Sequence, residues 1–182
     1  MSGEVALIER ARRFDKEALA EVYDLYSPGI YRYAMRLLGD NDLAEDCVSE
    51  TFSRFLHGLR NGSGPTDFLK AYLYRIAHNW ITDYYRRSPP PAVPLEPYFN
   101  LARDEDPSYE VVRKTEQERI RAALALLTPD QRQVIMLKFL EEFSNDDIAL
   151  ALNKPVGAVK SLQHRALDSL RRIMFHAEER LQ

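Results

Sequence analysis

The sequence predicts an all-α protein made of two small helical domains joined by a flexible linker. Apolar residues recur at helical spacing in both halves of the 182-residue chain, and no segment alternates apolar and polar residues as a β-strand does. Between the halves, residues 88–107 are rich in proline and acidic side chains, a composition typical of an extended linker. We therefore expect a first domain at 1–87, a linker at 88–107 and a second domain at 108–182.

The first part of the chain predicts three amphipathic helices. One spans residues 15–26, and a second begins at Pro28, because proline is favoured in the first turn of a helix. Glycine and polar residues at 39–41 then break the chain before a third helix at 42–59. The inward face of this third helix is apolar: Leu43, Cys47, Val48, Phe52, Phe55 and Leu59.

The other face of helix 42–59 is polar and largely acidic. Such a face lies against water or against a partner, and the pattern alone favours a solvated surface. Its residues are Glu45, Asp46, Ser49, Glu50 and Arg54.

A loop of glycine, proline and small polar residues at 61–66 precedes a helix at 67–87 that interleaves an apolar stripe with polar groups. Alternating aromatic rings, an amide and arginines suit unpaired bases, which stack on rings and hydrogen-bond to polar edges. The pattern alone favours ordinary core packing for four of the apolar side chains: Tyr72, Ile76, Trp80 and Tyr84. A second group is less easily buried: Tyr74, Asn79, Arg86 and Arg87.

Residues 128–172 predict a helix-turn-helix with a supporting helix in front. A capping-box pattern at 128–131 starts the first helix, and another at 144–147 starts the second. Asn153 ends the second helix, since asparagine tolerates the left-handed conformation of a tight helix exit. Pro155 is then suited to the first turn of the next helix.

The last of these helices is basic. Between residues 154 and 172, five lysines and arginines stand against one aspartate, a formal charge of +4. In helix-turn-helix proteins the second helix lies in the DNA major groove with its N-terminal residues at the base edges. Charge alone would equally fit a solvated helix, but the order of caps, turn and helices favours DNA binding. The candidate base-contacting residues are Ala158, Lys160, Ser161, Gln163, His164 and Arg165.

Composition and motifs exclude several classes of protein. The single cysteine, Cys47, rules out an intramolecular disulfide and a cysteine-based zinc site. No H-E-x-x-H motif, nucleophile elbow or glycine-rich phosphate loop is present, so we expect no enzyme, metal site, cofactor or small-molecule substrate. The charged N-terminus and the lack of a long apolar run predict neither a signal peptide nor membrane insertion, and hence a soluble cytoplasmic protein.

The helix-turn-helix block also resembles a known family. Residues 144–167 read S-N-D-D-I-A-x-A-L-N-x-P-V-G-A-V-K-S-x-x-H-R-A-L, which is similar to region 4 of the extracytoplasmic-function (ECF) group of bacterial RNA polymerase sigma factors. That region binds the promoter -35 element. Asn153 stands where the family usually has glycine, and Leu162 stands where it commonly has arginine. Either Leu162 is buried here, or the set of -35 contacts differs from that of the family.

The N-terminal half resembles sigma region 2 in two motifs. Residues 38–52 read L-G-D-x-x-x-A-E-D-x-V-x-E-T-F, and residues 68–87 read F-L-K-A-Y-L-Y-R-I-A-H-N-x-x-x-D-x-x-R-R. The resemblance implies that the polar face of helix 42–59 docks on the clamp helices of the largest polymerase subunit. Leu69 and Ala71 stand where phenylalanine and threonine are usual, which leaves the preferred -10 base open.

The same resemblance implies that the second motif and its preceding loop capture the -10 strand. Tyr74, Ile76 and Asn79 would help to form the pocket for a flipped-out base. The implied -10 residues are Tyr74, Arg75, Ile76, His78, Asn79, Asp83, Arg86 and Arg87.

We therefore expect a transcription initiation factor that binds core RNA polymerase and recognises -35 duplex and -10 melted strand. The resemblance implies promoter DNA, the polymerase clamp helices, the flap of the second-largest subunit and an anti-sigma factor as partners. An autonomous helix-turn-helix regulator that binds operator DNA without polymerase is the first alternative. An interaction adaptor whose helix-turn-helix no longer binds DNA is the second. A surface for single strands separates the expected function from the first alternative, because an operator-binding repressor needs none.

Overall fold

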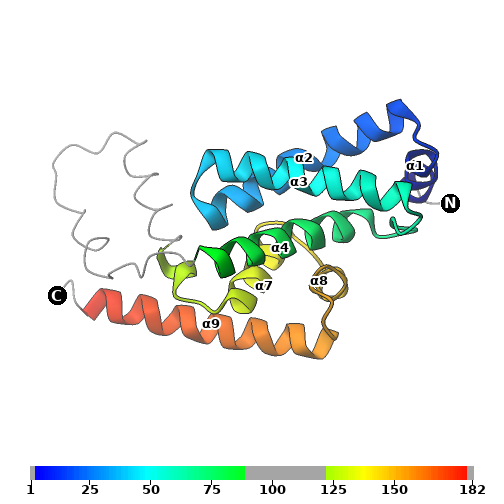
Figure 1. Cartoon of the computed structure of the whole chain (residues 1–182). Helices are drawn as coiled ribbons and strands as arrows, with labels where there is room; N and C mark the ends of the chain where they lie inside the picture. The colour runs from blue at the N-terminus through cyan, green and yellow to red at the C-terminus, as the bar shows by residue number, and fades with distance from the viewer. Residues whose placement is uncertain (1–2, 89–121, 180–182) are drawn as a thin grey trace.

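The computed structural model describes residues 3–88 and 122–179, and every regular element in these two ranges is an α-helix. The first range holds α1 (Gly3–Arg12), α2 (Lys16–Leu38), α3 (Asn41–Arg60) and α4 (Leu69–Arg87). The second holds α7 (Pro129–Phe139), α8 (Asn145–Leu152) and α9 (Val156–Glu179), labelled as in Figure 1. The predicted all-α fold is confirmed. Apart from Ser88, the predicted linker at 88–107 lies outside the described residues, as does the start of the second domain at 108–121.

The first four helices pack around one apolar core. Asp15 caps α2, because its Oδ1 accepts hydrogen bonds from the backbone N–H groups of Glu17 at 2.9 Å and Ala18 at 3.2 Å. The inward face predicted for helix 42–59 is confirmed, since five of its six residues are buried and Leu43 is partly buried. The most enclosed large side chains of this half include Ile8, Val22, Ile30, Tyr33, Phe55, Leu73 and Ile81.

The predicted helix break at Pro28 is wrong. α2 runs without interruption from Lys16 to Leu38 and carries Pro28 in its interior. A proline inside a helix costs about 3 kcal/mol. Val22 and Ile30 lie on either side of it and are both fully buried, and each contributes roughly 1.5–3 kcal/mol. Burial of the two flanking segments in one core therefore offsets the proline.

The C-terminal half folds as the sequence predicts. Both capping boxes are present, with Thr128 and Gln131 bonded in both directions at 3.3 and 3.2 Å, and Ser144 paired with Asp147 at the start of α8. Asn153 ends α8 with φ 52°, the left-handed conformation expected of it. α7 and α8 pack against α9, which forms the long outer helix of this half.

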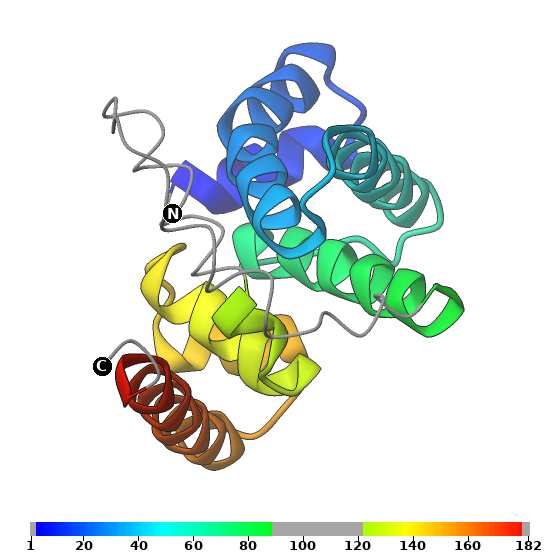
Figure 2. The ribbon, with the colours of Figure 1, turned by 90° about the vertical axis from the view of Figure 1, so that its left-hand side faces the viewer.

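The two halves lie against each other along α4. Figure 2 shows α1, α2 and α3 above α4 and the C-terminal helices below it. α4 packs on α2 and α3 through one side and on α8 through another. Both flanks of α4 are therefore engaged within the chain, which bears directly on the residues predicted to bind a strand.

Candidate nucleic-acid and protein interfaces

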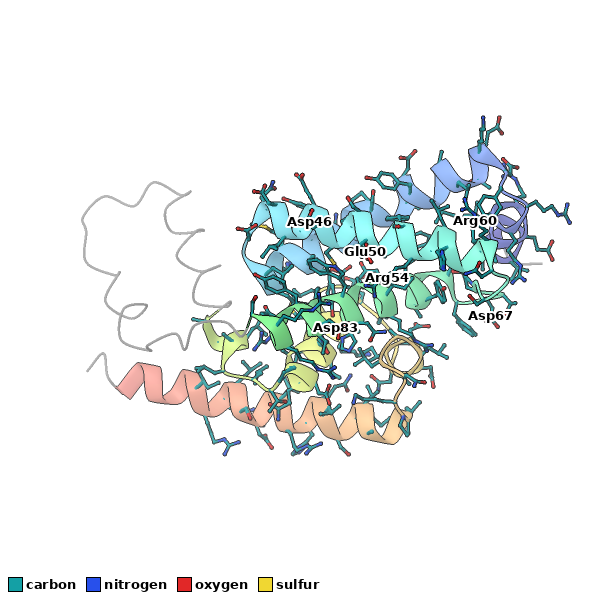
Figure 3. All side chains as sticks on the ribbon, viewed as in Figure 1. Asp46, Glu50, Arg54, Arg60, Asp67 and Asp83 are labelled. Atoms are coloured by element: carbon teal, nitrogen blue, oxygen red, sulfur yellow. The ribbon has the colours of Figure 1, made fainter. Side chains whose placement is uncertain are left out.

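The polar face of α3 is exposed as predicted. Glu45, Asp46, Ser49 and Arg54 are exposed and Glu50 is half-buried, while the opposite face packs into the core (Figure 3). Arg54 donates from Nε to Oε1 of Glu50 at 2.6 Å. An exposed pair of this spacing contributes only about 0.3–0.5 kcal/mol to stability, so its charges are not needed for the fold and remain available to a partner.

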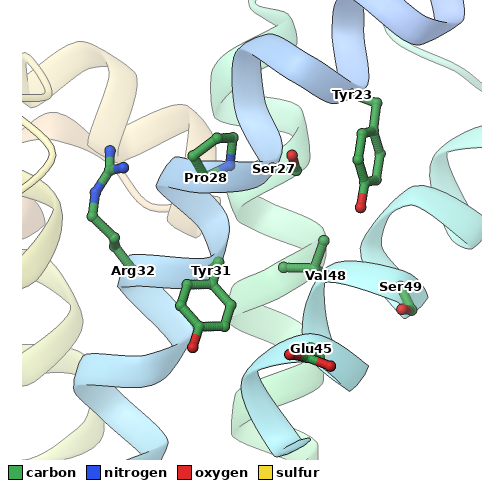
Figure 4. A pocket seen from close by; sticks show the side chains of 8 residues that line it. All are labelled: Tyr23, Ser27, Pro28, Tyr31, Arg32, Glu45, Val48 and Ser49. Carbon is green, nitrogen blue, oxygen red and sulfur yellow. The ribbon is translucent and has the colours of Figure 1, made fainter. Parts of the chain in front are cut away.

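A groove of about 470 Å³ runs beside this face, between α2 and α3. Tyr31 donates its hydroxyl to Oδ1 of Asn41 at 2.6 Å, and Asn41 donates from Nδ2 to Oε1 of Glu45 at 3.0 Å. This chain of bonds fixes the Glu45 carboxylate at the edge of the groove. The sequence did not predict that α2 would supply part of the groove lining. Helical periodicity shows which face of a helix is polar, but not which other helix will pack beside that face. The lining residues, shown in Figure 4, are Tyr23, Ser27, Pro28, Tyr31, Arg32, Glu45, Val48 and Ser49.

Among the candidate -10 residues, Tyr74 departs most from the burial expected of it. We expected its side chain to be less easily buried, yet only 2% of it is exposed. Its hydroxyl donates to Oε2 of Glu141 at 2.6 Å, and its ring packs edge-on against Tyr33 and Phe143 with centroids 5.4 and 5.0 Å away. Burial raises the pKa of the phenol, and the neighbouring Glu141 raises it further. In this arrangement Tyr74 contacts the C-terminal half and is closed to any base.

Two more of the candidate -10 residues contact the C-terminal half. Arg75 donates from Nε to the backbone oxygen of Leu150 at 2.9 Å, and its Nη2 donates to the same oxygen. The half-buried ring of His78 lies near Asp130 and Lys154, and burial lowers its pKa to about 4. The Lys154 ammonium lowers this pKa as well, whereas the Asp130 carboxylate opposes the shift.

The other candidate -10 residues remain accessible. Asn79, Arg86 and Arg87 are exposed, and Ile76 and Asp83 are partly exposed. The four side chains for which core packing was favoured are only partly buried, and the rings of Trp80 and Tyr84 stack with centroids 5.9 Å apart. One side of α4 is therefore covered by the C-terminal half, and another side remains accessible. We call the accessible side the polar strip of α4; its polar residues are Asn79, Asp83, Arg86 and Arg87.

Sequence reasoning missed the left-handed backbone of Phe68 and the burial of Glu141. Phe68 precedes α4 with φ 49° and 49% of its surface exposed, and no side chain caps the helix there. A left-handed non-glycine residue leaves no mark in the apolar pattern, so no sequence signal predicted this conformation. Glu141 is buried in the turn between α7 and α8, although an acidic residue in a turn is normally expected to be solvated.

On α9, the candidate -35 residues form an open surface. Lys160, Ser161, His164 and Arg165 are exposed, and Ala158 and Gln163 are partly exposed. The opposite face, which includes Val159, Leu162 and Ala166, is buried. Leu162 is only 8% exposed, which resolves the choice left open by the sequence: it is a core residue of the helix-turn-helix.

Within residues 3–88 and 122–179, no cluster of three or more potential metal ligands is found. No helix of this described part is both long enough and apolar enough to cross a membrane.

Two family models and several relatives match the chain. Residues 22–88 match sigma-70 region 2, and residues 117–170 match sigma-70 region 4. The chain is 31% identical over 173 residues to the ECF RNA polymerase sigma factor BldN of Streptomyces coelicolor, covering 92% of this chain and 64% of BldN. It is also 31% identical over 175 residues to the ECF RNA polymerase sigma factor SigW of Bacillus subtilis, covering 91% of this chain and 93% of SigW.

Solved structures agree on the fold. The structure of CnrH in complex with the cytosolic domain of CnrY aligns with TM-score 0.72 and 21% identity, over 95% of this chain and 97% of that one. The sigma factor RpoE of Bartonella quintana, solved with the anti-sigma factor NepR, aligns with TM-score 0.59 and 24% identity, over 87% of this chain and 95% of that one. The helix order, the two matched regions and the relatives together establish that this chain belongs to the ECF group of RNA polymerase sigma factors.

Proposed function

We propose that this chain is a transcription initiation factor that binds core RNA polymerase and directs it to specific promoters. The observation that carries the proposal is the presence, in one chain, of the exposed polar face of α3, the polar strip of α4 and the open basic face of α9. An autonomous operator-binding protein would need only the last of these. The polymerase performs the phosphoryl transfer, and the chain supplies recognition.

The polymerase-binding surface is the outer face of α3. Asp46, Glu50 and Arg54 lie along it and make no contact that the core requires. The clamp helices of the largest subunit are the proposed partner of this face, and the flap of the second-largest subunit is the proposed partner of the C-terminal half. The groove between α2 and α3 gives the clamp a concave seat, with the Glu45 carboxylate held at its edge.

DNA recognition is divided between α9 and α4. α9 enters the major groove of the -35 element, with Lys160 and Arg165 as its exposed cations. α4 binds the melted -10 strand, and Asn79 is the amide placed to hydrogen-bond to a base edge. Tyr74 and Ile76 complete the proposed pocket for a flipped base, and Tyr74 joins it only when the two halves separate.

We also propose that the chain acts in the cytoplasm without inserting into a membrane and is held inactive by an anti-sigma factor. Two solved structures of similar fold support the second point, since the Bartonella RpoE was solved with the anti-sigma factor NepR and CnrH with the cytosolic domain of CnrY. No cofactor or small-molecule substrate forms part of the proposed function.

Pull-down with core RNA polymerase, followed by run-off transcription on genomic fragments, tests the proposal. The expected result is a stable complex and discrete start sites that depend on the added chain. Gel-shift titration of the chain alone on the promoter so identified is the counter-test. A single helix-turn-helix reads only one half-site, and a chain of net charge -3 has little long-range attraction for DNA. Tight, sequence-specific binding without polymerase would therefore establish the autonomous regulator instead.

A further inference from the structure

Glu141 is a buried carboxylate at the boundary between the two halves, and only 6% of its side chain is exposed. Its Oε2 accepts the Tyr74 hydroxyl at 2.6 Å, and its Oε1 lies 3.6 Å from Nη1 of Arg36. Its backbone oxygen accepts a hydrogen bond from Nζ of Lys70 at 3.1 Å. We call these four residues the Glu141 contact. One residue of the C-terminal half thus engages both α2 and α4.

The turn between α7 and α8 is shaped to present this carboxylate. The backbone N–H of Glu141 donates to the carbonyl oxygen of Met136 at 3.2 Å, and Glu142 takes a left-handed conformation with φ 56°. Phe143 follows, 3% exposed, with the Lys70 ammonium 4.4 Å from the centre of its ring. A carboxylate and an aromatic ring therefore meet α4 together, one on either side of the left-handed residue.

Two contacts extend this boundary along α4. Arg75 donates to the backbone oxygen of Leu150 at the end of α8. Thr82, about two turns further along α4, accepts a hydrogen bond at Oγ1 from Nε2 of Gln133 on α7 at 3.3 Å. The C-terminal half therefore covers one continuous side of α4, from the position of Lys70 to that of Thr82.

This covered side overlaps the surface proposed to hold the -10 strand. Tyr74 and Arg75 belong to both, whereas Asn79 remains outside the boundary and is exposed. The -35 surface is not covered, because Lys160 and Arg165 lie on the exposed face of α9. In this closed arrangement α9 is free to bind duplex DNA, whereas part of the α4 surface proposed to bind the single strand is covered.

The Glu141 contact is specific but incompletely satisfied. No described residue donates a hydrogen bond to Oε1 of Glu141, and Arg36 reaches it only as a partly exposed ion pair. Burying a carboxylate offsets much of what its partners contribute unless every lone pair is satisfied. The Glu141 contact therefore favours one specific arrangement of the two halves, but its net stabilisation is small enough for the halves to separate.

We propose that the Glu141 contact is an autoinhibitory closure: it holds the C-terminal half against α4 in the free chain and must break before α4 can bind a single strand. The closure itself is independent of what the chain binds. The statement about the strand rests on the proposed function.

Small-angle X-ray scattering of the full-length chain tests the closure without DNA or polymerase. The variant is Glu141→Ala, and the matched control is Glu142→Ala, which removes an adjacent and exposed carboxylate. A hydrogen bond to a charged group is strong enough that its loss shifts an equilibrium by about tenfold or more. We expect a larger radius of gyration for Glu141→Ala and an unchanged one for the control.

Tyr74→Phe provides a second route that keeps the ring in place. It removes only the hydroxyl that Glu141 accepts, so we expect the same expansion with unchanged helical circular dichroism. If Glu141→Ala lowers the helical circular dichroism, that variant is partly unfolded, and the radius of gyration of Tyr74→Phe alone tests the closure. An unchanged radius of gyration in Tyr74→Phe, or in a folded Glu141→Ala, overturns the closure.

Strand binding supplies the functional arm. The probe is a fluorescein-labelled single-stranded oligonucleotide carrying the non-template -10 sequence of the promoter found by run-off transcription. A site that is open only part of the time binds with an affinity reduced by the open fraction. We expect Glu141→Ala to bind this probe about tenfold more tightly than Glu142→Ala. Expansion without tighter binding would confirm the closure and contradict its role in strand binding, so the two claims fail separately.

Discussion

Gly29 on α2 lies so close to Tyr74 on α4 that a Cβ atom at position 29 would stand 2.6 Å from the tyrosine hydroxyl and 3.6 Å from Oε2 of Glu141. Glycine in a helix interior costs roughly 1 kcal/mol relative to alanine. α2 bears this cost at the one point where the Tyr74 hydroxyl and the Glu141 carboxylate meet. The absence of a side chain at position 29 is therefore part of the boundary between the two halves.

The first prediction concerns this pair. Gly29→Ala alone should displace the Tyr74 hydroxyl and destabilise the closed arrangement, although it favours the helix. In the background of Tyr74→Phe the hydroxyl is gone, so Gly29→Ala should become neutral or stabilising. Chemical denaturation of the four proteins of this double-mutant cycle should give a coupling free energy of about 1 kcal/mol or more. Gly157→Ala is the control, because a Cβ atom there meets nothing within 4 Å. If the changes in unfolding free energy of Gly29→Ala and Tyr74→Phe simply add, position 29 and the Tyr74 hydroxyl do not interact.

The second prediction concerns pH. The pKa of His78 is lowered to about 4 in the folded chain, chiefly by burial, whereas an unfolded histidine titrates near 6.5. Both states are neutral above pH 6.5, and below it only the unfolded chain binds the proton. The contribution of His78 to stability is therefore full above pH 6.5 and is lost as the pH falls towards 4, by about 3 kcal/mol in total.

Thermal or chemical unfolding between pH 7 and 4 measures this loss. His78→Gln should flatten the dependence on pH relative to the native chain, because glutamine has no proton to gain. His57→Gln, at an exposed position, is the matched control and should leave the slope unchanged. The same slope in native chain and His78→Gln would assign the pH dependence to other groups.

The third prediction concerns the polymerase surface. The double substitution Asp46→Lys and Glu50→Lys should abolish binding to core RNA polymerase. It should cost little stability, since exposed substitutions usually change the free energy of unfolding by within about 0.5 kcal/mol. Glu9→Lys with Glu17→Lys makes the same change of charge on exposed positions of α1 and α2 and should bind normally. Fluorescence anisotropy measures the affinity of each variant for polymerase. If the α3 variant binds as tightly as the native chain, α3 is not part of the interface.

The fourth prediction concerns α9. Lys160→Ala or Arg165→Ala should each weaken binding of the polymerase complex at the -35 element. If the lost contact is to a phosphate, the slope of log affinity against log salt should fall by about 1. Arg13→Ala removes an exposed arginine from the other half and should leave -35 binding unchanged. Footprinting of the promoter at several salt concentrations separates loss at the -35 element from loss at the -10 element.

The fifth prediction concerns Leu162. Because this side chain is buried against the helix-turn-helix core, Leu162→Ala should destabilise the chain by about 2–4 kcal/mol. Restoring the arginine common in the family by Leu162→Arg should also destabilise, since it buries an unpaired charge. Leu167→Ala, at a residue that is 38% exposed, should cost much less. Tighter -35 binding by a stable Leu162→Arg variant would contradict the burial of this position.

The elements that the sequence predicted well are those fixed by local chemistry. The capping boxes at 128–131 and 144–147 bond within a single turn of chain, so their residue types alone specify them. The exposed face of α3 follows in the same way from helical periodicity. Asn153 was placed correctly because its left-handed conformation is a property of that residue and its neighbours.

The features that the sequence could not predict depend on distant residues. Tyr74 is buried by residues far away in the chain: its hydroxyl donates to Glu141, 67 positions later, and its ring packs against Tyr33 and Phe143. No pattern within α4 reports these contacts. Pro28 marks a helix start in local statistics, but here burial of Val22 and Ile30 keeps α2 continuous. In both cases tertiary packing outweighed a sound local preference.

The bond from Arg75 to Leu150 has a consequence for exchanging parts between relatives. Its acceptor is a main-chain oxygen, and every residue type supplies one wherever a helix ends in the same place. In a chimaera that joins this N-terminal half to the C-terminal half of another member, Arg75 would find its acceptor regardless of the side chain at that position. Tyr74 and Arg36 contact a side-chain carboxylate instead, and they would lose this partner wherever the other member has no acidic residue at that position. Such chimaeras would keep the alignment of α4 with α8, but the free energy of association of their two halves would differ from one chimaera to another.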